Sequence, residues 1–449
     1  MRKKFEHAMK KVESDIKQNE SFRWHPQAQL RSISSAGYSA QPATPNAFSG
    51  TQKGVQYIVD VDCDKTLRSL RQVLTNRQEF CVHPPLYKPE PVCDHNKNGS
   101  FFQCLSSGTD GLPKRVRRTH RSWINSFHIN AQLAGITSAD SYAIIGRLSH
   151  SLALYAALEA AHLGADLHAI TDLRADRQFN ALRTLQSSIL YATPTQLRRL
   201  CKHAKATDID QLRVRHIFCG GGKLDQATAI NVRKVFQLAT IQVFYGATET
   251  SFISITDDQT PSGSVGKPYP SVEIAIGKTP STHDRSKEHT IGKIWVRSPY
   301  LFQAYVDKHA LAAHWHNGYI SVGEMGYVDR EGYLFLAGRE SRRVSIADTV
   351  VYPEEIETAL LELAAVSHCA VIPVEDDQRG CVLVAVVEAA GSQELKQKLL
   401  TYLRRCVGPL KAPRDIVFVN AMPQLLSGKP DLRSLELQLS QQVKQDRPT

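Results

Sequence analysis

The feature that most constrains the fold of this sequence is an alternation between residues 141 and 249, where short apolar stretches are separated by segments of helical composition. Apolar stretches typical of β-strands occur at 141–150, 166–171, 187–192, 214–222 and 240–249. Helical segments at 152–165 and 194–204 lie between them. Strands that alternate with helices are typical of sheets whose strands are mostly parallel. The sequence therefore predicts an α/β fold.

The rest of the chain predicts further units around this centre. A chain of 449 residues is too long for one simple core. After Gly263 the pattern changes to short strands and turns, which predicts a β-rich subdomain. Residues 342–449 hold enough strands and helices for a small α+β domain of their own. Residues 20–55 are rich in Ser, Gln, Ala, Pro and Gly and are predicted to be loop or a loosely packed arm.

Hydropathy and cysteine usage indicate the compartment. No apolar run approaches the roughly 18 residues that a membrane span needs, and the charged N-terminus lacks the apolar core of a secretory signal. The nine cysteines contain no C-x-x-C pair, which argues against a zinc site or a disulfide framework. The sequence predicts a cytoplasmic protein without a transmembrane segment.

The formal net charge of +11 is unevenly distributed, because residues 1–341 carry the whole positive excess. Five cations lie within residues 114–121. A nucleic-acid patch is one interpretation of such a run, but it contains no interleaved aromatic residues and no nucleic-acid reading motif. The favoured interpretation is affinity for a polyanionic small molecule or an acidic carrier protein, with no nucleic-acid partner.

The segment SSGTDGLPK, residues 106–114, has the composition of a loop that holds phosphates. It is not the P-loop of nucleoside triphosphatases, because Pro113 stands where that pattern needs a glycine and Arg115 where it needs a hydroxyl residue. Hydroxyls, backbone N–H groups and a lysine can all bind phosphate oxygens. A loop of this composition is also common as a plain turn, so its meaning depends on the rest of the chain.

Seven motifs, in order along the chain, resemble those of the adenylate-forming superfamily, which comprises acyl- and aryl-CoA synthetases, adenylation domains of peptide synthetases, and luciferases. They are SSGTDGLPK (106–114), GGG (220–222), YGATE (245–249), GSVGKP (263–268), GYISVGEMGYVDREGYLFLAGR (318–339), YPEEIE (352–357) and SGKPDLRSL (427–435). The resemblance implies a large N-terminal domain over residues 1–339, shortened at its start, and a small mobile domain over residues 340–449. It also implies two half-reactions. A carboxylate attacks the α-phosphorus of ATP, giving an acyl-adenylate and pyrophosphate, and a thiol then attacks the adenylate.

The same resemblance implies an ATP site. The residues that would grip the β- and γ-phosphates are Ser106, Ser107, Gly108, Thr109, Gly111 and Lys114. Glu249 corresponds to the magnesium ligand, for which a hard carboxylate oxygen is suitable, and Thr248 faces the adenylate phosphate. Read singly, Glu249 would be an ordinary solvated loop acid.

Further positions correspond to contacts with the nucleoside. Those implied to lie along adenine are Gly220, Gly221, Gly222, Tyr245, Gly246 and Ala247. A glycine lets the backbone approach a ligand closely because it has no Cβ. Tyr245 could equally be a core aromatic. Glu324 and Arg339 correspond to the residues that hold the ribose hydroxyls, although each alone could be a surface charge.

The remaining implied positions concern catalysis, the acyl group and motion. Lys429 corresponds to a catalytic lysine that bridges the substrate carboxylate and the α-phosphate as charge builds between them. Ser341 stands at the hinge between the domains. His150 and Phe252 correspond to positions that line the acyl pocket and favour an aromatic or medium-chain acid. His150 could equally be a buried core histidine.

Among the departures from the family pattern, three concern residues that would act on the ligands. Asp110 stands within the phosphate loop, where a carboxylate ~6 Å from triphosphate repels it by roughly 1 kcal/mol, unless Lys114, Arg115 and Arg117 offset the charge. Glu324 replaces the usual aspartate. Asp348 replaces a glycine that lines the approach of the thiol, which keeps a carrier protein open as the acceptor.

The sequence therefore predicts an AMP-forming acid–thiol ligase that uses ATP, Mg²⁺ and coenzyme A on a small carboxylic acid. One alternative is a stand-alone adenylating enzyme that loads the phosphopantetheine of an acyl carrier protein. An alternative of another class is a nucleotide-binding protein without catalysis, motivated by Asp110, Glu324 and Asp348. The combination of Glu249, Lys429, Arg339 and Lys114 argues against that last alternative.

Overall fold

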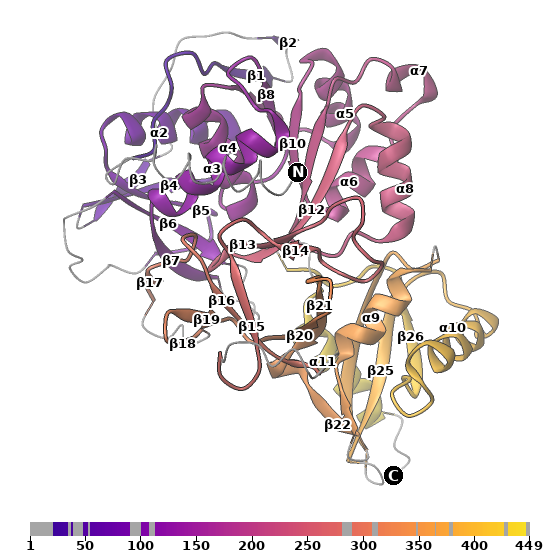
Figure 1. Ribbon diagram of the computed structural model, residues 1–449. Helices are drawn as coiled ribbons and strands as arrows, with labels where there is room; N and C mark the ends of the chain where they lie inside the picture. The colour runs from indigo at the N-terminus through magenta and orange to yellow at the C-terminus, as the bar shows by residue number, and fades with distance from the viewer. Residues whose placement is uncertain are drawn as a thin grey trace.

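The computed structural model describes residues 21–34, 37–38, 48–52, 54–89, 100–106, 113–280, 290–307, 313–346, 349–363, 365–376, 380–425 and 430–445. Three large sheets lie in the first three quarters of the chain, and two small sheets follow (Figure 1). In the described part of the chain, no helix has both the length and the apolar character needed to cross a membrane.

The largest sheet has nine strands in the order β14-β13-β12-β11-β10-β8-β9-β1-β2. They are β1 (Leu30–Ser34), β2 (Gly37–Tyr38), β8 (Ser141–Ile144), β9 (Asp166–Ala169), β10 (Ile189–Ala192), β11 (His216–Cys219), β12 (Thr240–Ala247), β13 (Ser251–Ile255) and β14 (Lys267–Pro268). Neighbours from β12 to β1 are parallel, and β13, β14 and β2 pair antiparallel at the two ends. The predicted α/β fold with mostly parallel strands is confirmed.

Helices cover both faces of this sheet (Figure 1). Along β10, Ile189 and Tyr191 belong to one hydrophobic cluster and Leu190 and Ala192 to another, because successive side chains of a strand point to opposite faces. The helices on the first face are α3 (Arg121–Ala134) and α4 (Ser151–Leu163). Those on the second face are α5 (Ala175–Thr184), α6 (Pro194–Cys201) and α8 (Gln226–Val235), with the short α7 (Ala206–Ile209) between the last two in sequence.

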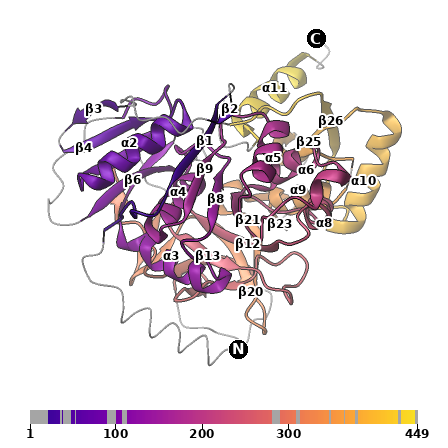
Figure 2. The ribbon, with the colours of Figure 1, turned by 90° about the horizontal axis from the view of Figure 1, so that it is seen from above.

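A six-stranded sheet in the order β17-β7-β6-β5-β4-β3 lies across α4 from the nine-stranded sheet. Its elements are β3 (Phe48–Gln52), β4 (Val55–Val59), α2 (Cys63–Thr75), β5 (Glu79–His83), β6 (Phe101–Ser106), β7 (Lys114–Thr119) and β17 (Ala304–Tyr305). Figure 2 shows α4 between β6 and the strands β8 and β9. The start of α4 therefore faces both sheets.

The prediction of loop for residues 20–55 is wrong where β1, β2 and β3 form. β1 extends the nine-stranded sheet by pairing with β9, and β3 forms an edge by pairing with β4. Pairing with strands from distant segments stabilises these strands even though their composition favours turns.

The expected β-rich subdomain is present as a second six-stranded sheet, and its pairings are antiparallel. Its strands are β15 (Glu273–Ile276), β16 (Gly292–Arg297), β18 (His314–His316), β19 (Tyr319–Ser321), β20 (Glu324–Val328) and β21 (Leu334–Arg339).

The last hundred or so residues have hydrophobic clusters of their own on either side of a three-stranded sheet, β24-β25-β26. After the short 3₁₀ helix η1 (Glu340–Arg342), their elements are β22 (Val344–Ile346), β23 (Thr349–Val351), α9 (Pro353–Leu361), β24 (His368–Asp376), β25 (Gly380–Glu388), α10 (Gln393–Val407), β26 (Asp415–Val419) and α11 (Leu432–Gln445). Helices α9 and α10 share one cluster and α11 belongs to the other. This unit contacts the larger one at α6, where Arg198 Nη1 donates to the carbonyl oxygen of Ser367 at 3.3 Å.

Candidate active site

The candidate site lies where β12 ends and turns into β13. Gly246 permits this tight hairpin, because a Cβ there would lie 1.8 Å from the carbonyl oxygen of Ser251. Ser251 itself has a φ of +57°, a left-handed conformation that non-glycine residues rarely adopt. The hairpin holds Thr248 and Glu249 at the end of the sheet, immediately after the last residue of β12.

The end of β12 meets the first turn of α4. The hydroxyl oxygens of Thr248 and Ser151 are 3.2 Å apart, and His150 is the N-cap residue of α4. His150 also forms an isolated parallel bridge with Leu105, which precedes Ser106 at the end of β6. The structure thus brings the entry of the phosphate loop, His150 and Thr248 to one place.

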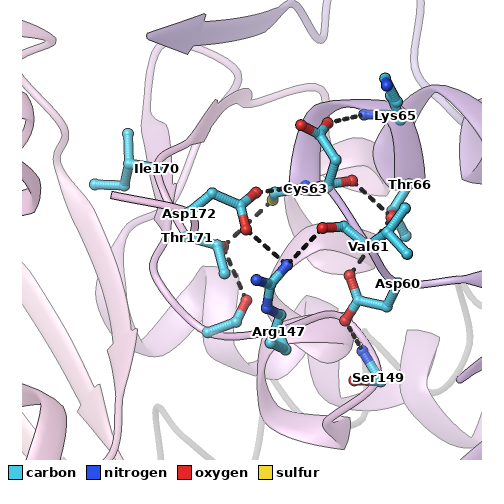
Figure 3. Close-up of polar contacts among 12 residues, drawn as sticks. Asp60, Val61, Cys63, Lys65, Thr66, Arg147, Ser149, Ile170, Thr171 and Asp172 are labelled. Carbon is cyan, nitrogen blue, oxygen red and sulfur yellow. Dashed lines mark hydrogen bonds and ion pairs between the residues drawn. The ribbon is translucent and has the colours of Figure 1, made fainter. Parts of the chain in front are cut away.

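The turn that carries His150 is fixed to both sheets (Figure 3). The carboxylate of Asp60, at the end of β4, accepts the backbone N–H of Ser149 at 2.7 Å. Arg147 Nη1 donates to the carbonyl oxygen of Val61 at 3.1 Å and pairs with Asp172 at 2.6 Å. Burial lowers the pKa of His150, so this imidazole is neutral near pH 7.

Glu249 is nearly buried, with 8% of its surface exposed. Its Oε1 accepts the hydroxyl of Tyr305 at 3.0 Å, and its carbonyl oxygen accepts the N–H of Phe302 at 2.8 Å. Burial, together with the carboxylate of Glu249, raises the pKa of Tyr305 well above its usual range, so the phenol keeps its proton. Within the described ranges, no three His, Cys, Asp or Glu side chains are grouped to hold a metal ion. The single carboxylate of Glu249 fits Mg²⁺, because this ion usually binds one or two protein carboxylates together with phosphate oxygens and water.

Arg118 holds the main chain of this hairpin from within the protein, a role that no sequence motif indicated. Its side chain is fully buried, and its Nη1 donates to the carbonyl oxygens of Thr248 at 2.6 Å and Glu249 at 3.3 Å. Its Nη2 donates to Ser251 Oγ at 2.7 Å and to the carbonyl oxygen of Tyr300. Burial lowers the pKa of Arg118 to about 10, so it stays charged at neutral pH. Arg118 therefore fixes both residues implied to act on the phosphates.

Arg115 and Arg117, two further cations of the run expected to have affinity for a polyanion, are also buried. Arg115 is 1% exposed and pairs with Asp307 at 3.1 Å, and Arg117 pairs with Glu79 at 2.9 Å. These partners occupy the guanidinium groups inside the protein. The charges that were expected to attract a polyanion or to offset Asp110 are thus neutralised internally at Arg115 and Arg117, and Asp110 itself lies outside the described residues.

The glycines of the GGG segment lie beside β12, because they follow β11, which runs parallel to β12 and ends at Cys219 opposite Val243. A Cβ at Gly220 would lie 2.2 Å from the ring of Phe244, and Gly221 has a φ of +81°.

Tyr245 lies close to Glu324 and Arg339. Burial raises the pKa of Tyr245 well above its usual range. The negative charge of Glu324 raises this pKa further, and the positive charge of Arg339 opposes the shift. Glu324 and Arg339 face each other across β20 and β21 and form an ion pair of 3.2 Å.

The remaining implied positions are dispersed or not described. Phe252 is 3% exposed and belongs to the core behind the hairpin. Ser341 is exposed and lies in the middle of η1. Its neighbours are both ion-paired: Glu340 pairs with Lys293, and Arg342 pairs with Glu357. The implied residues that lie outside the described part of the chain are Ser107, Gly108, Thr109, Gly111, Asp348 and Lys429.

Two family models match this chain. The family model for AMP-binding enzymes matches residues 34–306, and the model for the AMP-binding enzyme C-terminal domain matches residues 355–429. The chain belongs to the AMP-binding enzyme family. The resemblance inferred from the seven motifs is confirmed.

Relatives within the AMP-binding enzyme family are named as ligases. The chain is 30% identical over 348 residues to YhfT of Bacillus subtilis, named an uncharacterized acyl–CoA ligase, with 76% of this chain and 69% of the relative covered. It is 32% identical over 328 residues to VraA of Staphylococcus haemolyticus, whose name describes a candidate long-chain fatty acid–CoA ligase, with 72% and 67% covered. These relatives confirm the predicted enzyme class, an AMP-forming acid–thiol ligase.

The fold is also that of a solved member of this class. The O-succinylbenzoate coenzyme A synthetase of Bacillus subtilis, in a complex with ATP and a magnesium ion, superposes with a TM-score of 0.65 at 23% identity. The match covers 79% of this chain and 73% of the synthetase. The predicted arrangement of a large N-terminal unit and a small C-terminal unit is confirmed at the level of the fold.

Proposed function

We propose that this protein activates a small carboxylic acid with ATP and Mg²⁺ to form an acyl-adenylate, and transfers the acyl group to the thiol of coenzyme A. The observation that supports this most directly is the convergence of Thr248 and Glu249 with His150 and Ser106 at the junction of α4, β6 and β12. A group of this composition can position a phosphate chain and a carboxylate side by side.

Residue roles follow from the chemistry of the step. Bound Mg²⁺ would neutralise phosphate charge, as adenylate formation needs positioning and charge stabilisation more than covalent help. Glu249 supplies the protein's carboxylate for that ion, and the hydroxyl of Thr248 orients the phosphate that receives the acyl group. Because His150 is neutral, it lines the acid's entrance without adding charge. Tyr245 and the Gly220–Gly222 backbone take the adenine, and the ion-paired Glu324 and Arg339 take the ribose.

The C-terminal unit supplies the second set of groups in this proposal. Residues 340–449 form the mobile domain, Ser341 lies at its hinge, and Lys429 stabilises the charge that develops between carboxylate and α-phosphate.

The N-terminal unit holds the rest of the nucleotide in this proposal. The residues of the phosphate loop that contact the β- and γ-phosphates are Ser106, Ser107, Gly108, Thr109, Gly111 and Lys114. Glu324 can accept both ribose hydroxyls as the usual aspartate does.

Coenzyme A is the acceptor favoured by the names of the relatives. An acyl carrier protein is the second acceptor, because Asp348 stands where a glycine usually lines the thiol's path. The structure removes one argument for an acidic carrier, since Arg115, Arg117 and Arg118 of the basic run are buried and hold internal partners.

The deciding experiment is ATP–pyrophosphate exchange with a series of carboxylic acids and Mg²⁺ and without thiol, followed by addition of coenzyme A or a purified phosphopantetheinylated carrier. Exchange with an acid, and acyl transfer to coenzyme A, are the expected results. Transfer only to the carrier would change the acceptor. ATP binding without exchange for any acid would contradict the proposal and favour a nucleotide-binding protein without catalysis.

A further inference from the structure

The short strand β17 lies directly beside the residue proposed to bind the metal ion. It pairs antiparallel with β7, with Tyr305 opposite Val116 (Figure 1). Opposed residues of an antiparallel pair share one face of the sheet, and so do residues two apart along a strand. Tyr305 therefore lies on the same face of this sheet as Arg118, and both side chains reach the β12–β13 hairpin.

These two side chains hold Glu249 at different points. Arg118 donates to the carbonyl oxygen of Glu249 at 3.3 Å and so fixes its main chain. The N–H of Phe302 donates to that same oxygen at 2.8 Å. The hydroxyl of Tyr305 instead donates to the side chain of Glu249, at Oε1 and a distance of 3.0 Å. The main chain and the carboxylate of Glu249 thus have separate supports.

Contacts on both sides of Tyr305 hold β17 in place. The N–H groups of Gln303 and Val306 each donate to a carbonyl oxygen of β7 at 2.8 Å. The carboxylate of Asp307 accepts the backbone N–H of Arg115 at 2.7 Å and its Nη2 at 3.1 Å. Arg115 is 1% exposed, so this ion pair is anchored inside the protein. The hydroxyl of Tyr305 therefore reaches Glu249 from a strand that is itself fixed.

A carboxylate that is held at one oxygen offers its other oxygen to a metal ion in a defined orientation. Mg²⁺ demands near-ideal octahedral geometry, so a ligand fixed in advance binds it better than one that rotates. Hydrogen bonds to ligating carboxylates supply this orientation, and their loss typically costs about 10- to 100-fold in metal affinity or activity.

We propose that Tyr305 is a positioning residue for the metal ion: it holds Oε1 of Glu249 and leaves Oε2 to bind the Mg²⁺ that accompanies ATP. This inference rests on the proposed function, and it adds a residue that acts through Glu249. No sequence motif marks Tyr305, which lies 56 residues after Glu249 in the chain.

The test measures ATP binding by calorimetry, once with Mg²⁺ and once with EDTA in its place, for the full chain and its Tyr305→Phe variant. The ratio of the two dissociation constants reports what the ion contributes, and it requires neither an acid nor turnover. Tyr305→Phe removes the hydroxyl and keeps the ring. We expect it to reduce this ratio by ~10-fold and to leave the affinity for metal-free ATP unchanged.

ATP–pyrophosphate exchange gives a second readout of the same variant. The Mg²⁺ concentration at half-maximal rate should rise by ~10-fold, whereas the maximal rate at saturating Mg²⁺ should change little. In a Glu249→Gln background, Tyr305→Phe should have no further effect on the ratio of dissociation constants, because its acceptor is then altered. A full additional loss in that background would contradict an action through Glu249.

Tyr142→Phe is the matched control, because Tyr142 also donates its hydroxyl to a buried carboxylate, that of Glu159, which has no proposed role in metal binding. It should lower stability and leave the ratio of dissociation constants at the value of the parent. Equal ratios in the parent and Tyr305→Phe would overturn the inference, as would an equal fall in both tyrosine variants.

The inference and the proposed function can fail separately. If no acid supports exchange, the proposed adenylation fails, and the two dissociation constants still judge Tyr305. If Mg²⁺ does not tighten the binding of ATP to the parent, the role of Tyr305 is overturned, whether or not exchange occurs.

Discussion

The two faces of the nine-stranded sheet are built from different chemistry. Under α5, α6 and α8, the buried side chains are mostly aliphatic, with Leu190, Ile217 and Leu197 typical of them. Under α3 and α4, tyrosines surround the buried carboxylate of Glu159. The first face holds its buried polar groups at a helix end, where Asp225 caps α8, whereas the second holds a carboxylate in the middle of its core and borders the candidate site. The face under α5, α6 and α8 therefore supports the fold, whereas the face under α3 and α4 also borders the site.

The largest effect should come from Glu249, on the side of the site. Glu249→Gln keeps the shape but removes the charge, so we expect ATP–pyrophosphate exchange to fall by roughly 10²- to 10³-fold. Steady-state rates over a Mg²⁺ titration measure the effect. A variant with unchanged rate and Mg²⁺ dependence would remove Glu249 from metal binding.

The next effect concerns Glu159 and pH. Burial raises the pKa of this carboxyl from 4.5 to about 7, so the folded state keeps a proton that the unfolded state releases. Retaining this proton stabilises the folded state. The stabilisation is complete below the pKa that Glu159 has in the unfolded chain, and it is lost as the pH rises through the pKa that Glu159 has in the folded protein. It amounts to roughly 3 kcal/mol. Chemical denaturation of the parent and Glu159→Gln between pH 4.5 and 8 measures it.

In that comparison the free energy of unfolding of the parent should decline relative to Glu159→Gln as the pH rises. Leu190→Ala is the control on the aliphatic face, where cavity formation lowers stability to a similar extent at every pH. A constant difference between the parent and Glu159→Gln across the pH range would contradict the raised pKa.

A smaller effect is expected at Arg118. Arg118→Met leaves the carbonyl oxygens of Thr248 and Glu249 without their buried donor, so the hairpin should lose its fixed position. We expect the Mg²⁺ concentration at half-maximal exchange to rise by ~10-fold. Arg117→Met removes a cation of similar burial that pairs with Glu79, and it should change stability but not the Mg²⁺ requirement. The same shift in both variants would reduce Arg118 to a purely structural residue.

The smallest effect belongs to the opposite face. Asp225 is the N-cap of α8, and its carboxylate accepts the N–H of Thr228 at 2.8 Å. Asp225→Ala should lower the free energy of unfolding by about 1 kcal/mol without changing kcat, and Asp225→Asn should retain most of the cap. Thermal denaturation and exchange kinetics together check this. A large loss of kcat would show that this face also supports catalysis.

The class of fold and the family could both be predicted from the residues alone. Alternating strand and helix patterns predicted the parallel sheet, because periodicity is a local property, and the motifs around Thr248, Glu249 and Arg339 identified the kind of site. The motif glycines also carried local meaning, as the close approach at Gly246 demonstrates.

The surroundings of those motifs, by contrast, depend on contacts between segments that are distant in the chain. The basic run of β7 reads as a surface in sequence, yet Arg115 meets Asp307 and Arg118 meets Thr248 across more than a hundred residues of chain. Likewise, nothing local joins Glu159 to Tyr191. Whether a charged or polar side chain is solvated or buried depends on partners that arrive from distant segments. For that reason the support of Glu249 by Arg118 and the tyrosines around Glu159 became visible only in the folded chain.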